Sequence, residues 1–482
     1  MSVFDASIDS DIDLIHVRQE AAAVHMADSW GRLTGQPGVA LVTAGPGFAN
    51  TLSALYVAKM SESPVVLLSG HSPHKDGVGS FQKMAQVDMA RPVTKASWKV
   101  NEASMFGTDV AEAFKIAASG RPGPVHLGLP VDLLEATVPT EQLDMQLNPG
   151  NFLNSNVSGT KLQQIFNTLC LANRPLVLAG PHMARGRTRI LLADLAERTD
   201  LPIVFMESPR GTADPSLGAF SDVLPEADAV LLLGKKLDFS LKMGRAPLFT
   251  KDCRFLLVDY EQVVIDEARS VITEPACLEV AAIGSPLKAV RKIFSEMPGS
   301  LVVDRGWTEK VKSAIAYSPR SWDRIETLNE DEDVHPLAVG RSVRDFMSRQ
   351  QDAVFVSDGG EFGQWAQAMI SAPDRVINGP SGAIGGGVPF ALGARCARPG
   401  SPIFLTSGDG SFGYHIMEVD TAVRYNFPFV AIVGNDATWN AEYQIQLRDY
   451  GEDRLIGCEL LPTRYDLLVE SLGGFGVHVT SI

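Results

Sequence analysis

Gly408-Asp409-Gly410-Ser411 and, further on, Gly434-Asn435-Asp436-Ala437-Thr438 are the stretches that decide the fold class of this chain. The apolar run at 403–406 predicts a buried strand before the first stretch, and residues 412–425 predict a helix after it. A second apolar run at 429–433 leads into the second stretch. Both aspartates therefore follow strands of a predicted parallel sheet, at the edge where open α/β sheets bind ligands.

The two stretches offer oxygen ligands for a divalent metal, and such a metal could hold a diphosphate. Asp409 and Asp436 carry carboxylates, and the carbonyl of Thr438 supplies a third hard oxygen, a set that suits Mg²⁺ alongside phosphate oxygens. A helix that begins after Gly410 adds free N–H groups that attract phosphate. A Gly-Asp-Gly tripeptide alone is more often a simple turn. The order strand, helix, strand across the two stretches, with each aspartate directly after a strand, favours a binding site instead.

This arrangement resembles the signature of thiamine-diphosphate (ThDP) enzymes, in which GDG is followed by Asn-Asn at the spacing that separates the two stretches here. The chain has Asp436 where the family has the second asparagine, which places an extra negative charge near the diphosphate. The resemblance implies ThDP and Mg²⁺ as cofactors, with Asp409, Asp436 and Thr438 as the metal ligands.

The composition is that of a large intracellular protein. With 482 residues and 45% hydrophobic content, the chain predicts about three domains of about 150 residues each. A net charge of −15 without a basic cluster argues against nucleic acid or an anionic membrane as a partner. Five scattered cysteines and no apolar run of membrane length predict a cytoplasmic location.

The first segment, residues 1–140, places Glu20 at the start of an alanine-rich helix, after a short predicted strand at 14–17. An acid in a first helical turn is often merely solvated. The segment resembles the pyrimidine-binding domain of ThDP enzymes, and this match assigns Glu20 the activating role. In this role its carboxylate would hydrogen-bond N1′ of the pyrimidine ring of ThDP. The N4′ nitrogen of the same ring would then take the proton from C2 of the thiazolium ring. In the family this glutamate comes from a second subunit, which implies a homodimer or homotetramer with shared sites.

Phe81 and Gln82 belong to a loop that resembles the one in acetolactate synthases and benzaldehyde lyase. The resemblance implies that Phe81 shapes the substrate pocket and that Gln82 hydrogen-bonds the substrate oxygen. A surface loop with an exposed amide is the alternative. The polar stretch 141–159 predicts a linker.

Residues 160–295 predict a second α/β domain, followed by another linker at 296–334. In some ThDP enzymes this middle domain binds FAD or an ADP-bearing ligand, but no sequence feature here supports FAD. Cations that follow one predicted strand could meet a nucleotide phosphate or a coenzyme A, although such residues more often form a solvated edge. They are Lys235, Lys236, Lys242 and Arg245.

Residues 335–482 predict the diphosphate-binding domain. The resemblance places Ile384 under the bent cofactor, and Glu361 and Phe362 at the diphosphate end or the rim of the site. Trp439, after the metal loop, is similar to the acetolactate synthase and benzaldehyde lyase branch. The implied cofactor contacts are Gly408, Asp409, Gly410, Ser411, Ile384, Glu361, Phe362, Asp436 and Trp439.

The sequence thus predicts an α/β protein of three domains, each with a central, mostly parallel sheet flanked by helices. Relative to the family it is shortened at both ends, with 19 residues before Glu20 and an end soon after a predicted strand at 477–479. The predicted activity is acetolactate synthase-like carboligation of 2-keto acids. The alternatives are a 2-hydroxyacyl-CoA lyase or benzaldehyde lyase activity, and a truncated non-catalytic paralogue.

Overall fold

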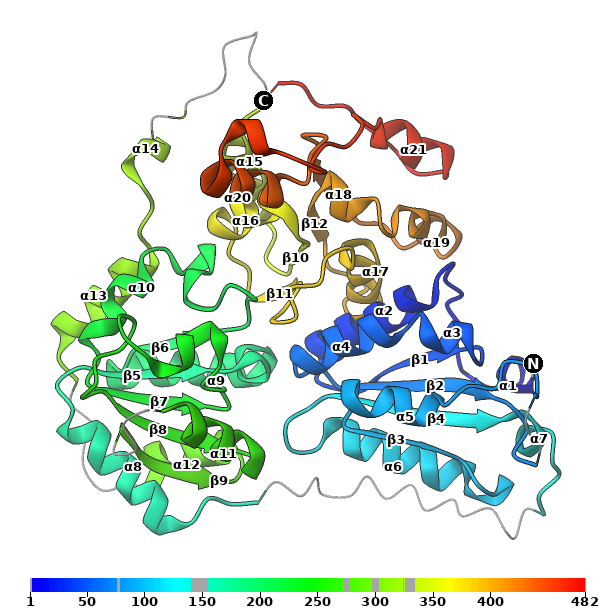
Figure 1. Ribbon diagram of the computed structural model, residues 1–482, viewed down its shortest axis with the longest axis horizontal. Coiled ribbons are helices and arrows are strands. Elements are labelled where there is room, and N and C mark those ends of the chain that lie inside the picture. Colours follow the sequence, from blue (N-terminus) through cyan, green and yellow to red (C-terminus); the bar gives the residue numbers. More distant parts are fainter. Residues whose placement is uncertain are drawn as a thin grey trace.

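The computed structural model describes residues 2–75, 79–139, 155–272, 277–296, 303–323, 325 and 334–481. These residues form three lobes, each built on one sheet (Figure 1). Every strand pair in the three sheets is parallel, so the predicted α/β class is confirmed. Most of the predicted linker at 141–159 lies outside the described residues. No described helix is both long and apolar enough to cross a lipid bilayer.

The N-terminal lobe has a four-stranded sheet in the order β1-β2-β4-β3. Its strand β2 is buried on both faces: Val65 and Leu67 pack towards α2 and α4, whereas Val66 packs towards α6. This explains why the strand is a continuous apolar run. The elements are α1 (Ser2–Ile8), α2 (Glu20–Thr34), β1 (Gly38–Val42), α3 (Pro46–Ala49), α4 (Leu52–Met60), β2 (Val65–His71), α5 (Gln86–Ala90), β3 (Ala96–Lys99), α6 (Phe106–Ala118), β4 (Pro124–Pro130) and α7 (Val131–Leu134).

The middle lobe has a five-stranded sheet in the order β6-β5-β7-β8-β9. Its elements are α8 (Gly159–Leu171), β5 (Pro175–Ala179), α9 (Gly186–Thr199), β6 (Ile203–Phe205), α10 (Phe220–Val223), β7 (Ala229–Leu233), β8 (Arg254–Asp259), α11 (Gln262–Val271), β9 (Leu278–Ile283), α12 (Pro286–Glu296) and α13 (Arg305–Ile315). Helix α13 lies inside the predicted linker 296–334, and that prediction is wrong for this part. The helix belongs to the lobe because Trp307 and Val311 are buried in its core, with Trp307 Nε1 donating to the carbonyl of Pro175 at 2.8 Å.

The C-terminal lobe has a four-stranded sheet in the order β11-β10-β12-β13. Its elements are α14 (Arg320–Asp323), α15 (Pro336–Met347), β10 (Val354–Ser357), α16 (Gly360–Met369), β11 (Asp374–Ile377), α17 (Gly387–Ala397), β12 (Ile403–Gly408), α18 (Asp409–Phe412), α19 (Val419–Arg424), β13 (Val430–Gly434), α20 (Asn440–Tyr450) and α21 (Tyr465–Ser471). The predicted strand at 477–479 is wrong, since these residues pair with no strand among those described.

The predicted helix at 412–425 is interrupted. Helix α18 ends at Phe412, the 3-10 helix η10 spans Ile416–Glu418, and α19 follows. His415 Nδ1 lies 2.6 Å from the carbonyl oxygen of Gly385, and this contact holds the chain between the helices away from a continuous helical path. A local tertiary contact therefore overrides the helical pattern of the sequence.

The predicted strand at 14–17 is also absent. The segment pairs with no strand and lies against α19 instead (Figure 1). The backbone N–H of His16 donates to the hydroxyl of Tyr425 at 2.8 Å, and the carbonyl of His16 accepts from Arg424 at 2.7 Å. Side chains of the C-terminal lobe thus satisfy the polar groups that a strand would pair with another strand.

Helices α2 and α17 join the N-terminal and C-terminal lobes (Figure 1). Ser29 Oγ donates to the carbonyl of Phe390 at 2.8 Å, and the rings of His25 and Phe390 meet edge to face at 5.0 Å. Gly393 allows the two backbones to come close, because a Cβ there would lie 2.8 Å from Met26 Cα. The arrangement of these two lobes depends on this close contact.

We expect Gly393→Ala to destabilise the protein although alanine favours helices. The added methyl group would force α2 and α17 apart, at a cost of about 1–3 kcal/mol, and thermal or urea unfolding would measure it. Gly400→Ala is the matched control, since a Cβ at that position has no neighbouring atom within 4 Å. Equal unfolding midpoints for the two variants would contradict the tight contact.

Candidate functional site

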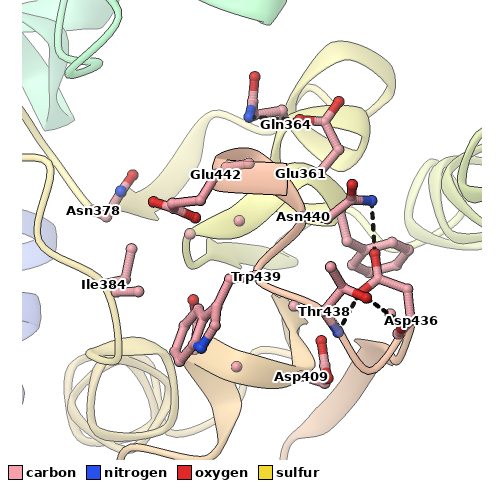
Figure 2. Close-up of a pocket in the computed structure, with 18 of the residues that line it drawn as sticks. Glu361, Gln364, Asn378, Ile384, Asp409, Asp436, Thr438, Trp439, Asn440 and Glu442 are labelled. Atoms are coloured by element: carbon pink, nitrogen blue, oxygen red, sulfur yellow. Dashed lines mark hydrogen bonds between the residues drawn. The ribbon is translucent and has the colours of Figure 1, made fainter. Parts of the chain in front are cut away.

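A pocket of about 300 Å³ lies where β10, β12 and β13 end. Residues that follow each of these strands line it, and the middle lobe adds residues 208–210. All the C-terminal residues that the sequence predicted for the site line this pocket (Figure 2). They are Glu361, Phe362, Ile384, Gly408, Asp409, Gly410, Ser411, Asp436, Thr438 and Trp439.

Asp436 lies close enough to Asp409 to influence the ionisation of Asp409. Burial, and next the charge of Asp436, raise the pKa of Asp409 to about 6. Two like charges that meet in a pocket favour a bound cation, which would keep both carboxylates ionised. The electrostatics of the pocket therefore suit a divalent metal.

The loop after β13 is held in a defined shape. Asp436 Oδ1 accepts the N–H of Thr438 at 3.1 Å and Oδ2 accepts the amide of Asn440 at 2.7 Å (Figure 2). Ala437 has φ +52°, in the left-handed region, and the N–H of Trp439 donates to the carbonyl of Cys458 at 2.7 Å. The aspartate thus organises its own loop, so that the acid in place of the family's asparagine has a structural function as well as a negative charge.

The donor set fits a metal that is shared with phosphate. In the part of the chain that the structure describes, no group of three or more His, Cys, Asp or Glu side chains gathers for a metal ion. Two carboxylates and a backbone carbonyl leave coordination positions for phosphate oxygens, as Mg²⁺ prefers. Gly410 leaves room for the ring of Trp439, because a Cβ at this position would lie 2.5 Å from that ring.

Asp358 supports the pocket without lining it, and the sequence reasoning missed this residue. It is buried at the end of β10 and accepts the N–H groups of Gly359, Gly385 and Gly387 at 2.6, 3.0 and 2.7 Å. These bonds fix the loop that carries Ile384 into the pocket. The signal was present, since Asp358 follows a predicted strand in the same way as Asp409.

Several polar residues line the pocket around the predicted Glu361 without a recognisable sequence pattern of their own. Glu361 accepts a hydrogen bond from Gln364 at 3.1 Å, and its pKa is raised mainly by burial, while the charge of Arg210 lowers it. Further polar residues of the pocket are Ser208, Gln364, Gln367, Asn378, Asn440 and Glu442. They come from helices and loops whose positions only the packing of the lobes defines.

Glu20, Phe81 and Gln82 do not line this pocket. They gather around the 45–47 turn of the N-terminal lobe instead. Glu20 Oε2 accepts from Asn50 at 3.0 Å, and a Cβ on Gly47 would lie 3.2 Å from Glu20 Oε1. On the other side of the turn, a Cβ on Gly45 would lie 2.9 Å from the carbonyl oxygen of Gln82, while Phe81 is 85% exposed. One chain thus carries two separate groups of candidate residues.

The two groups lie in two segments that match known protein families. Residues 1–89 match the thiamine pyrophosphate enzyme N-terminal TPP binding domain, and residues 358–482 match the corresponding C-terminal TPP binding domain. The acetolactate synthase large subunit of Mycobacterium tuberculosis is 31% identical, over 99% of this chain and 86% of its own length. This chain belongs to the thiamine pyrophosphate enzyme family.

Other relatives of this thiamine pyrophosphate enzyme carry different names. The 2-hydroxyacyl-CoA lyase 2 of Xenopus laevis is 29% identical, over 96% of this chain and 79% of its own length. The oxalyl-CoA decarboxylase of Escherichia coli is 28% identical, over 98% of this chain and 84% of its own length. The family therefore supports ThDP as the cofactor and leaves the substrate open.

Removal of one pocket carboxylate tests the metal site. We expect Asp409→Asn to weaken magnesium-dependent ThDP binding by at least about 100-fold, the upper end of what even outer-shell ligands of metals contribute. Calorimetric titration of the apoprotein with ThDP, with and without Mg²⁺, measures this. Asp449→Asn, an exposed acid paired with Arg448, should bind as the wild type does. If both variants bound ThDP equally strongly and without Mg²⁺, the assignment of Asp409 as a metal ligand would be contradicted.

Proposed function

We propose that this protein is a ThDP- and Mg²⁺-dependent carboligase of the acetolactate synthase type, which acts on 2-keto acids as a homodimer with shared sites. The observation that carries the proposal is the separation of two half-sites in one chain. The pocket of the C-terminal lobe holds the predicted metal and diphosphate ligands, whereas Glu20 lies beside the 45–47 turn of another lobe. A second copy would supply the missing half to each pocket.

Each group of residues has a separate task in this proposal. Asp409, Asp436 and the carbonyl of Thr438 would hold Mg²⁺ on the diphosphate, and Ile384 would support the bent cofactor. Glu20 of the second copy would hydrogen-bond the pyrimidine ring, with Asn50 fixing the direction of its carboxylate. When bound, ThDP supplies the acidic carbon that attacks a carbonyl and then accepts electrons.

Arg210 supports a substrate with a carboxylate. It is the one cation among the described residues that line the pocket, which also holds four acids, Glu361, Asp409, Asp436 and Glu442. Its loop is fixed, since the neighbouring Glu207 is buried and pairs with Arg375 of β11 at 2.5 Å. A guanidinium presented in this way suits a single small anionic group, such as the carboxylate of a 2-keto acid.

A coenzyme A lyase activity is the second candidate, because two of the relatives carry CoA in their names. The cations that could bind a CoA or nucleotide phosphate give it limited support. Lys235 is buried and pairs with Asp238 at 3.0 Å, so its charge is already satisfied. Lys242 and Arg245 are exposed on the same stretch but do not line the pocket.

Substitution of Arg210 separates substrate binding from cofactor binding. For Arg210→Gln we expect the KM for pyruvate to rise about 10-fold to 100-fold, the value of one charge-assisted hydrogen bond, while the ThDP affinity stays unchanged. Steady-state kinetics and calorimetry measure the two quantities. Arg187→Gln, an exposed position of α9, is the control. Unchanged kinetics for pyruvate together with a raised KM for a 2-hydroxyacyl-CoA would favour the lyase.

A complementation experiment tests the shared site. Glu20→Gln and Asp409→Asn should each abolish activity, because every site of either homodimer lacks one essential carboxylate. Co-expression with two different tags isolates the mixed dimer, in which one of the two sites is intact. We expect about half of the wild-type activity in that dimer, since an isologous dimer has two equivalent sites. No recovery would contradict shared sites, and an inactive wild type that binds no ThDP would favour the non-catalytic paralogue.

A further inference from the structure

The segment that leads to Glu20 is attached to the C-terminal lobe of the same chain. His16 contacts Tyr425 and Arg424 through its backbone, as described above, and Arg18 Nη1 pairs with Asp420 at 3.3 Å. All three partners lie on or directly after α19. The start of α2 is therefore placed by a helix of another lobe.

Glu418, the last residue of η10, makes the central contacts of this attachment. Its Oε1 accepts the backbone N–H groups of Arg18 and Gln19, both at 3.0 Å, and Oε2 lies 3.2 Å from the N–H of Arg18. Thr421 Oγ1 donates to Oε2 at 2.6 Å and so orients the carboxylate. Glu418 is 1% exposed, and both oxygens of its carboxylate accept hydrogen bonds from these donors.

These bonds act at the residue that begins α2. Gln19 is the N-cap of the helix, its side chain accepts the N–H of Ala21 at 2.6 Å, and Glu20 is the first helical residue. A negative charge is favourable at this end of a helix, and the N–H groups at the start of a helix have no partner within it. Glu418 provides both the charge and the acceptor from outside the helix.

We propose that Glu418 is a positioning residue for Glu20, which holds the start of α2 so that the Glu20 carboxylate keeps the direction that activates the cofactor. The inference rests on the proposed function for the role of Glu20, but the contact itself does not. Without the charge of the carboxylate, the partly buried N–H groups of residues 18 and 19 would have a weaker acceptor, and the helix would begin less regularly. Glu20 would then shift relative to Asn50 and to the cofactor of the second copy.

The test compares Glu418→Gln with Glu470→Gln, an exposed position of α21 in the same lobe. The first readout is amide hydrogen exchange of residues 14–19 in the protein without cofactor, measured by mass spectrometry. The second readout is exchange of the C2 proton of bound ThDP, measured by proton NMR after an acid quench. Calorimetry of ThDP binding and a thermal melt accompany both.

For Glu418→Gln we expect amide exchange at residues 18 and 19 to become about 10-fold faster, because the local hydrogen bonds open more often. C2 proton exchange should slow by about 10-fold to 100-fold, the loss that a misplacement of about 1 Å can cause. The ThDP affinity should stay within twofold. Glu470→Gln should match the wild type in every readout.

Thr421→Val provides a milder variant if Glu418→Gln does not fold. It removes the hydroxyl that orients Glu418 and keeps the carboxylate, so smaller changes of the same sign are expected. Unchanged C2 proton exchange in a folded variant whose amides exchange faster would overturn the positioning role. Unchanged amide exchange would overturn the contact itself. A wild type without ThDP binding would sink the proposed function, and the amide exchange alone would then decide whether Glu418 holds the segment.

Discussion

The parallel pairing of β10, β12 and β13 is the constraint on which the site depends. Ser357 lies opposite Thr406, and Gly408 lies opposite Gly434, so the three strands end at the same edge. A parallel sheet places every carboxyl end on one side, and the residues that follow there must converge. The proximity of Asp409 and Asp436 is thus a result of strand register and of the turns that follow the two strands.

Glycine positions make this convergence possible. The N–H groups of Gly385 and Gly387 reach the buried carboxylate of Asp358, and Gly410 leaves space for the ring of Trp439. Each of these contacts joins a strand end to a loop from elsewhere in the lobe. Backbone groups therefore shape the pocket as much as the acidic side chains do, and backbone N–H groups hold the carboxylate of Asp358 in place.

The contact between α2 and α17 has a second consequence, because it keeps the two groups of candidate residues in one chain apart. The helix that begins with Glu20 is packed against α17 through His25, Met26 and Ser29, and α17 follows the loop of Ile384. Since α2 cannot also enter the pocket of its own chain, this packing supports the proposal that a second copy completes each site. The same contact explains why side chains of the C-terminal lobe hold the segment before Glu20.

Sequence reasoning could identify the elements whose formation depends on residues that are close together in the sequence. The apolar run at 403–406 predicted β12, because a strand buried on both faces needs no pattern other than hydrophobicity. Short strands such as β3 and β11 were missed, since half-buried residues in a four-residue strand leave no periodicity. The helix predicted at 412–425 failed because the His415 contact with Gly385 joins residues that are far apart in the sequence.

The same division holds for the site and for the protein as a whole. The sequence by itself determined the fold class, and it predicted the carboxylates proposed to bind the metal and the role proposed for Glu20. These predictions were possible because strand ends, glycine turns and carboxylates can be recognised in the sequence without knowledge of the fold. The tertiary structure decided that Arg210 faces the pocket, that Lys235 is neutralised by Asp238 and that Glu418 holds the residues before Glu20. Such contacts depend on how the lobes pack, and packing between distant segments leaves no periodic trace in the chain.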